Sequence, residues 1–150
     1  MSDTIQNYTI SRIITILENG NFEKFGFTDN SAYIYTHDYE IIIEASNHLI
    51  SNKTVKFAIE VLKHLDECVS KAQSWLGHFN LKNDEFYPDA LDKGYDINGI
   101  YIGRYESGGV RRLIDYGFTI TFSTKNYYPC GYTVKYHKNM TPFAVEEFVE

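Results

Sequence analysis

Apolar and polar residues alternate through the second half of the chain with the period of a β-strand. Every second residue is apolar or aromatic in three runs, at residues 100–102, 114–122 and 132–136. Glycine-containing segments at residues 107–109 and 128–131 separate these runs and are typical of hairpin turns. The pattern predicts an antiparallel β meander.

Residues 142–149 extend this meander as an edge strand in the interpretation that we favour. Thr141 and Pro142 are also a typical helix start, so a C-terminal helix stays open as the alternative.

The N-terminal segment, residues 4–18, fits a helix that ends at Gly20. Its apolar side chains recur at helical spacing, at Ile10, Ile13, Ile14 and Leu17. A glycine after the last periodic residue commonly ends a helix. The many β-branched residues and the pair Asn19 and Gly20 also suit a strand that enters a hairpin turn, which is the alternative.

Residues 22–45 alternate again and predict two or three short antiparallel strands. The alternating residues are Phe25, Phe27, Tyr33, Tyr35, Tyr39, Ile41 and Ile43. Residues typical of turns stand between them, at 28–30 and 37–38.

One long helix is expected over residues 53–76, with Asn52 as its N-cap and Gly77 as the first residue that can end it. Its main apolar stripe comprises Val55, Ala58, Ile59, Leu62, Leu65, Val69, Ala72 and Leu76. A second stripe lies beside it and comprises Phe57, Val61, Cys68 and Trp75. The first stripe can cover a sheet. The second must pack either on the rest of the chain, which we favour, or on a second copy, so the protein is either a monomer or a helix-mediated homodimer.

These elements predict a single α+β domain over residues 1–150. Its core is an antiparallel β meander with one long helix packed on a face, to which an N-terminal helix and a short β hairpin are added.

The amino-acid composition restricts the expected cellular location and the expected class of partner. Sixteen per cent of the residues are aromatic, 13 of them tyrosines, and the formal net charge is -6. Acidic charge disfavours nucleic-acid binding, which depends on Lys and Arg at phosphates. Two cysteines without a disulfide framework, no signal region and no apolar run near 18 residues predict a cytoplasmic protein that does not enter a membrane.

Motifs that would carry chemistry are weak in this sequence. No helix follows the glycines at 99, 103, 108 and 109, as a phosphate-binding loop would need. The segment around Gly99 lacks two ligand positions of a calcium loop. Glu60, His64 and Cys68 follow one helical flank, but zinc would need a fourth ligand from elsewhere. We therefore expect no catalytic residue, no metal and no organic cofactor.

A candidate binding surface lies in the C-terminal meander. It combines the arginines with nearby tyrosines: Tyr101, Arg104, Tyr105, Arg111 and Arg112. Arg and Tyr are enriched among the residues that dominate protein interfaces. The alternative is a plain hairpin tip whose positive charges are neutralised by Glu106 and Asp115.

Three segments, residues 53–76, 94–100 and 118–134, give the chain a pattern that resembles small stand-alone bacterial domains of unknown function. Some of these domains are immunity proteins that neutralise a cognate toxin. The resemblance implies a non-enzymatic protein-binding domain, for which a basic toxin would be a suitable partner. A small enzyme or ligand-binding domain with a pocket between the long helix and the sheet is the alternative.

Overall fold

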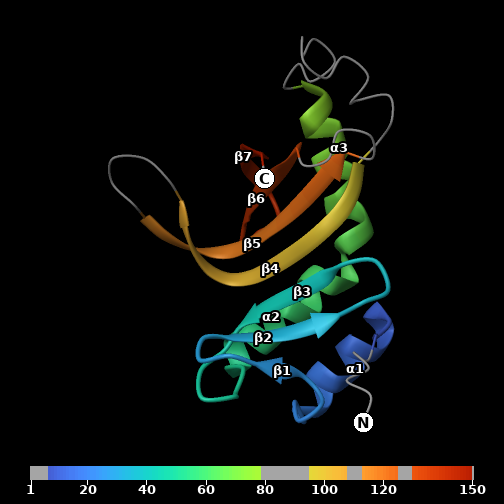
Figure 1. Cartoon of the computed structure of the whole chain (residues 1–150). Helices are drawn as coiled ribbons and strands as arrows, with labels where there is room; N and C mark the ends of the chain where they lie inside the picture. Colours follow the sequence, from blue (N-terminus) through green and yellow to red (C-terminus); the bar gives the residue numbers. More distant parts are fainter. Residues whose placement is uncertain (1–6, 79–94, 108–112, 125–129, 150) are drawn as a thin grey trace.

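The computed structural model describes residues 7–78, 95–107, 113–124 and 130–149, which form three helices and one seven-stranded sheet (Figure 1). The helices are α1 (Ile10–Asn19), α2 (Asn52–Lys63) and α3 (Leu65–His78). The strands are β1 (Gly26–Phe27), β2 (Ser31–Tyr35), β3 (Glu40–Glu44), β4 (Tyr95–Ser107), β5 (Leu113–Thr124), β6 (Cys130–His137) and β7 (Pro142–Val149). The predicted α+β class with a mostly antiparallel sheet is confirmed.

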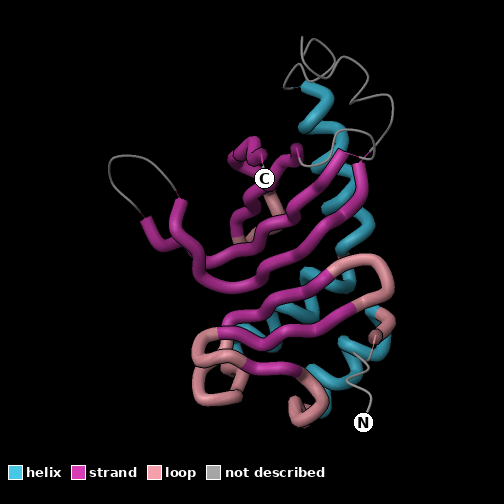
Figure 2. The backbone as a smooth tube through the Cα atoms, viewed as in Figure 1, coloured by secondary structure: helices cyan, strands magenta, loops and turns pink. Residues whose placement is uncertain are grey.

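The strands lie in the sheet in the same order as in the chain. Every neighbouring pair is antiparallel except β3 and β4, which pair in parallel. The meander prediction missed this pair. The chain leaves β3, passes through α2 and α3 and returns in the same direction, and such a crossover connection gives parallel strands. The predicted meander and the N-terminal strands therefore belong to a single sheet (Figure 2).

Alternation along the strands separates a covered face from an open one. The residues of β2 and β3 that face the helices are buried, namely Ala32, Ile34, Ile41 and Ile43. All three helices lie on that side of the sheet (Figure 1). The intervening residues, including Tyr33 and Ile42, are only half-buried. The period-two pattern thus defines which side of the sheet remains accessible.

The single long helix was a wrong prediction, because His64 divides it into α2 and α3. The backbone of His64 leaves the helical region, with φ -108° and ψ 17°, and its N–H reaches the carbonyls of both Glu60 and Val61. Its own carbonyl then accepts from Cys68 N–H, which begins the next helix. α2 lies against α1, β3 and β4, whereas α3 lies against β7. The break lets the two helices follow different parts of the curved sheet. α3 ends at His78, one residue beyond the expected Gly77.

The second apolar stripe packs inside the chain where the structure describes it. Val61 and Cys68 are buried, and the ring of Phe57 lies 5.0 Å from Tyr116 and 6.1 Å from Phe118. These positions need no second copy to cover them. The side chain of Trp75 lies outside the described residues.

Both terminal segments have the favoured secondary structure, but the N-terminal helix starts at Ile10 and not at residue 4 as predicted, because the Tyr8 N–H donates to the Tyr35 carbonyl and Thr9 caps the helix. α1 begins after Thr9, whose hydroxyl accepts from Arg12 N–H, and it ends at Gly20 in the left-handed conformation, with φ 72°. Residues 142–149 form β7, which pairs with β6.

Candidate functional site

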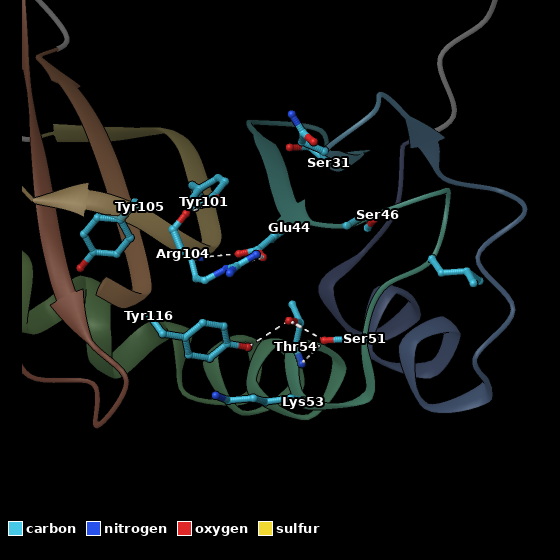
Figure 3. Close-up of a pocket in the computed structure, with 13 residues that line it drawn as sticks. Ser31, Glu44, Ser46, Ser51, Lys53, Thr54, Tyr101, Arg104, Tyr105 and Tyr116 are labelled. Carbon is cyan, nitrogen blue, oxygen red and sulfur yellow. Dashed lines mark hydrogen bonds and ion pairs between the residues drawn. The ribbon is translucent and has the colours of Figure 1, made fainter. Parts of the chain in front are cut away.

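A cleft opens where β3 ends and β4 continues. β3 stops at Glu44, while β4 runs on to Ser107, so the two strands separate. The cleft has a volume of about 900 Å³ and lies between this part of β4 and the start of α2 (Figure 3). The residues that line it are Asn30, Ser31, Glu44, Ala45, Ser46, Leu49, Ser51, Lys53, Thr54, Tyr101, Arg104, Tyr105 and Tyr116.

The Glu44 carboxylate binds both the backbone and the side chain of Arg104. Its Oε2 accepts from the Arg104 main-chain N–H at 2.6 Å. Its Oε1 accepts from Arg104 Nε at 2.8 Å and lies 2.7 Å from a terminal guanidinium nitrogen. The Arg104 side chain is nevertheless 67% exposed. The pair therefore holds an accessible guanidinium in one orientation.

Gly103 allows Glu44 to approach this closely. Its φ is 143°, which side-chain-bearing residues rarely adopt, and a Cβ at this position would collide with the Cβ of Glu44. The hydroxyl of Tyr101 reaches over the same stretch and donates to the Arg104 carbonyl at 2.7 Å. The local backbone and its neighbours thus fix one another.

The opposite wall is built on the first turn of α2. Ser51, and not Asn52 as predicted, caps the helix by accepting from Thr54 N–H at 3.2 Å. The Thr54 hydroxyl in turn accepts from Tyr116 at 3.1 Å, and Lys53 Nζ lies 4.8 Å from the centre of the Tyr116 ring. These contacts link α2 to β5 across the floor of the cleft (Figure 3).

The contacts set the charges of the cleft at neutral pH. Burial alone would raise the pKa of Glu44, but the hydrogen bonds and charge of Arg104 outweigh it and hold this pKa below its ordinary value. Burial, followed by the charge of Glu44, raises the pKa of Tyr101. Burial also raises the pKa of Tyr116. Glu44 and Arg104 are therefore ionised, and both tyrosines keep their protons.

Three of the five predicted binding residues meet in the cleft. Tyr101, Arg104 and Tyr105 all line it, and the Tyr105 hydroxyl donates to the Tyr136 carbonyl at 2.8 Å. The remaining two, Arg111 and Arg112, lie outside the described residues. Glu44 pairs with Arg104. The side chains of Glu106 and Asp115, which the alternative expectation gave as neutralising the hairpin tip, lie outside the described residues.

Sequence reasoning missed the residues that complete the cleft from other elements. Glu44, Lys53 and Thr54 come from β3 and α2. Glu44 lies 60 positions from Arg104, so no local spacing could connect them. Leu49 was missed as well, although it is 66% exposed at the rim.

A band of five side chains, three of them tyrosines, extends from the cleft over the open face of the sheet. Tyr33, Ile42 and Tyr101 are direct neighbours on β2, β3 and β4. Tyr35, which is 37% exposed, lies opposite Glu40 in the next row. We call these five residues the tyrosine face. It joins the cleft at Tyr101.

The Glu60, His64 and Cys68 flank forms no metal centre in the part of the chain that the structure describes, where no group of three or more potential ligands is close enough to hold an ion. His64 instead lies 3.7 Å from Glu60 and 3.8 Å from Glu67. Cys68 points into the core and is 2% exposed. None of the described helices combines the length and apolar composition that a membrane crossing requires.

No protein-family model, no curated protein and no solved structure matches this chain. The roles of the cleft residues therefore rest on the geometry of the chain itself.

Proposed function

We propose that this protein is a non-enzymatic protein-binding domain that docks its partner on the cleft and the tyrosine face. The observation that carries the proposal is the fixed orientation of the exposed Arg104 guanidinium, which pairs with Glu44 while the Tyr101 hydroxyl binds the Arg104 main-chain carbonyl. Arg and Tyr supply many of the largest contributions to protein interfaces.

Preorganisation is the physical reason to favour docking here. Binding normally costs about 0.5–1.5 kcal/mol for each flexible side chain that becomes ordered. The hydroxyls of Tyr101, Tyr105 and Tyr116 are already hydrogen-bonded, and Arg104 is already paired. A partner that contacts these side chains therefore has little of this cost left to meet.

The net charge of this chain indicates the charge of its partner. The whole chain carries a net charge of -6, so a basic protein associates with it faster than a neutral or acidic one. A basic toxin, such as a nuclease, fits this requirement. We therefore propose an immunity role, in line with the bacterial domains that the sequence pattern resembles.

The alternative is a small enzyme or ligand-binding domain that uses the same cleft between α2 and β4. Catalysis would need polar groups directed at a substrate. The polar groups of this cleft bond mainly to one another, and none of its described lining residues is a histidine or a cysteine. This arrangement favours docking over catalysis.

Photocrosslinking in the native host can identify the partner. A photoreactive residue in place of Leu49 should capture a basic protein, whereas the same residue in place of the exposed Glu18 on α1 should not. If the captured protein is a toxin, it should arrest growth when expressed alone, and co-expression of this chain should restore growth.

Affinity measurements with the purified partner then test the site. Arg104→Ala should weaken binding by about thirtyfold, which corresponds to about 2 kcal/mol. Arg12→Ala, which removes an exposed arginine of α1, is the matched control and should leave affinity unchanged. Equal affinities for the wild type and Arg104→Ala would exclude the cleft as the contact surface.

A further inference from the structure

The edge of β4 that faces β3 extends beyond its neighbour. The parallel pairing runs from Glu40 opposite Gly99 to Ile43 opposite Ile102. β4 continues to Ser107, and its other edge stays paired with β5 along the whole of this extension. A strand edge without a neighbouring strand is a place where another chain can add a strand.

Both backbone groups of Arg104 on this edge are occupied by side chains. The N–H and C=O groups of one strand residue point to the same side. The Arg104 N–H donates to Glu44 Oε2 at 2.6 Å, and the Arg104 carbonyl accepts from the Tyr101 hydroxyl at 2.7 Å. Glu44 and Tyr101 thus fill the two positions that the backbone of an added strand would need.

We propose that Glu44 and Tyr101, by occupying the Arg104 main-chain groups, prevent this edge from pairing with the same strand edge of a second copy of the chain. The inference goes beyond the protein-binding role and does not depend on it. A second copy is the natural occupant, because each copy carries the same edge and two β4 edges can pair antiparallel about a twofold axis. Such a pair would close an interface between the extended parts of β4.

Two features make these side-chain hydrogen bonds hard for an incoming strand to displace. The Glu44 carboxylate is ionised, and a charge-assisted hydrogen bond is roughly twice as strong as one between neutral groups. The same carboxylate pairs with the Arg104 side chain. An incoming strand would therefore have to separate this ion pair and also replace the two hydrogen bonds that side chains make to the Arg104 main chain. Pairing is therefore unfavourable in the wild type.

The double variant Glu44→Ala with Tyr101→Phe removes both caps. Light scattering should show its mass rising with protein concentration towards twice the mass of the wild-type species, whose mass should not change. Amide exchange at Arg104 should be about tenfold or more faster in the dilute variant than in the wild type. It should slow again as the variant associates, because the second copy then covers the amide.

The control is the double variant Glu40→Ala with Tyr33→Phe, which changes the same residue types on the same face of β3 and β2. It should keep the wild-type mass and the wild-type exchange at Arg104. The proposal is overturned if the Glu44 and Tyr101 variant keeps the wild-type mass at every concentration. It is also overturned if that variant associates while the Arg104 amide stays open.

The single variant Tyr101→Phe covers the case in which the double variant does not fold. It keeps the Glu44 ion pair and frees only the Arg104 carbonyl. Its mass should rise above the wild-type mass as the protein concentration increases, and a mass that stays at the wild-type value at every concentration would overturn the proposal.

Discussion

Glu44 binds Arg104 through both of its carboxylate oxygens, one on the main-chain N–H and the other on the guanidinium. A single side chain at the end of β3 therefore occupies the Arg104 main-chain N–H, orients the Arg104 side chain and neutralises its charge. The shape of the cleft depends on this pair, since it lies where the two strands separate.

Stability should depend on the protonation of Glu44. Its pKa is lowered in the folded protein, so its contribution is fully present above the ordinary glutamate pKa and is lost as the pH falls through the lowered folded value. Urea unfolding of the wild type and Glu44→Gln should therefore differ most near neutral pH and converge in acid. Glu40→Gln changes the same charge on the same strand and serves as the control. A wild-type advantage that persists in strong acid would contradict the assignment.

Tyr136→Phe should lower the free energy of unfolding by about 1 kcal/mol. The Tyr136 hydroxyl is fully buried and donates to the Cys68 carbonyl at 2.6 Å, which ties β6 to α3. The variant keeps the ring and its stacking on Phe118 at 4.4 Å, so only the hydrogen bond is lost. Tyr35→Phe removes an exposed hydroxyl from β2 and should change stability by less than about 0.5 kcal/mol. Equal losses in the two variants would show that the buried bond contributes nothing.

Gly117→Ala should destabilise the protein by about 3 kcal/mol. A Cβ at Gly117 would collide with the Tyr136 carbonyl oxygen of the neighbouring strand. Gly99→Ala is the matched control, because its nearest neighbour, the Glu40 carbonyl oxygen, would lie at an ordinary contact distance of 3.5 Å. Thermal unfolding of the two variants distinguishes a specific collision from a general need for glycine in β4 and β5.

The Cys68 thiol should react slowly in the folded protein. It is 2% exposed, and burial raises its pKa, so little thiolate is present or accessible at neutral pH. In a Cys130→Ser background, a thiol reagent should label Cys68 only on unfolding and at once in denaturant. Rapid labelling under native conditions would show that α3 opens readily from the sheet.

The strands were predictable because burial alternates along most of their length, above all in β2 and β3. Ile41 and Ile43 are fully buried, whereas Ile42 between them is only half-buried. The break at His64 was not predictable from local sequence, since neither glycine nor proline marks it. Helix propensity continues through this residue, and the packing of α2 and α3 on different parts of the sheet decides the outcome.

The residues of the cleft were predictable only in part, for a related reason. The composition around Arg104 indicated a contact surface, and Tyr101 and Tyr105 do line the same cleft. Its acidic member, Glu44, reaches Arg104 through the β3 and β4 pairing, 60 positions away in the chain. A single sequence contains no signal that places those two strands side by side.

The parallel β3 and β4 pair also has a consequence for folding kinetics. Among the described residues, no helix lies in the connection of any other strand pair, whereas β3 and β4 pair only after the segment that contains α2 and α3 has closed into a loop. Closing a long loop loses chain entropy before the contacts between the two strands can lower the free energy. We therefore expect this pair to form after the folding transition state. Ile102→Val, in a buried position of β4 at this junction, should then accelerate unfolding and leave the folding rate nearly unchanged in a chevron measurement. The unfolding rate, and with it the lifetime of the native state, would accordingly depend on the parallel pairing of β3 with β4.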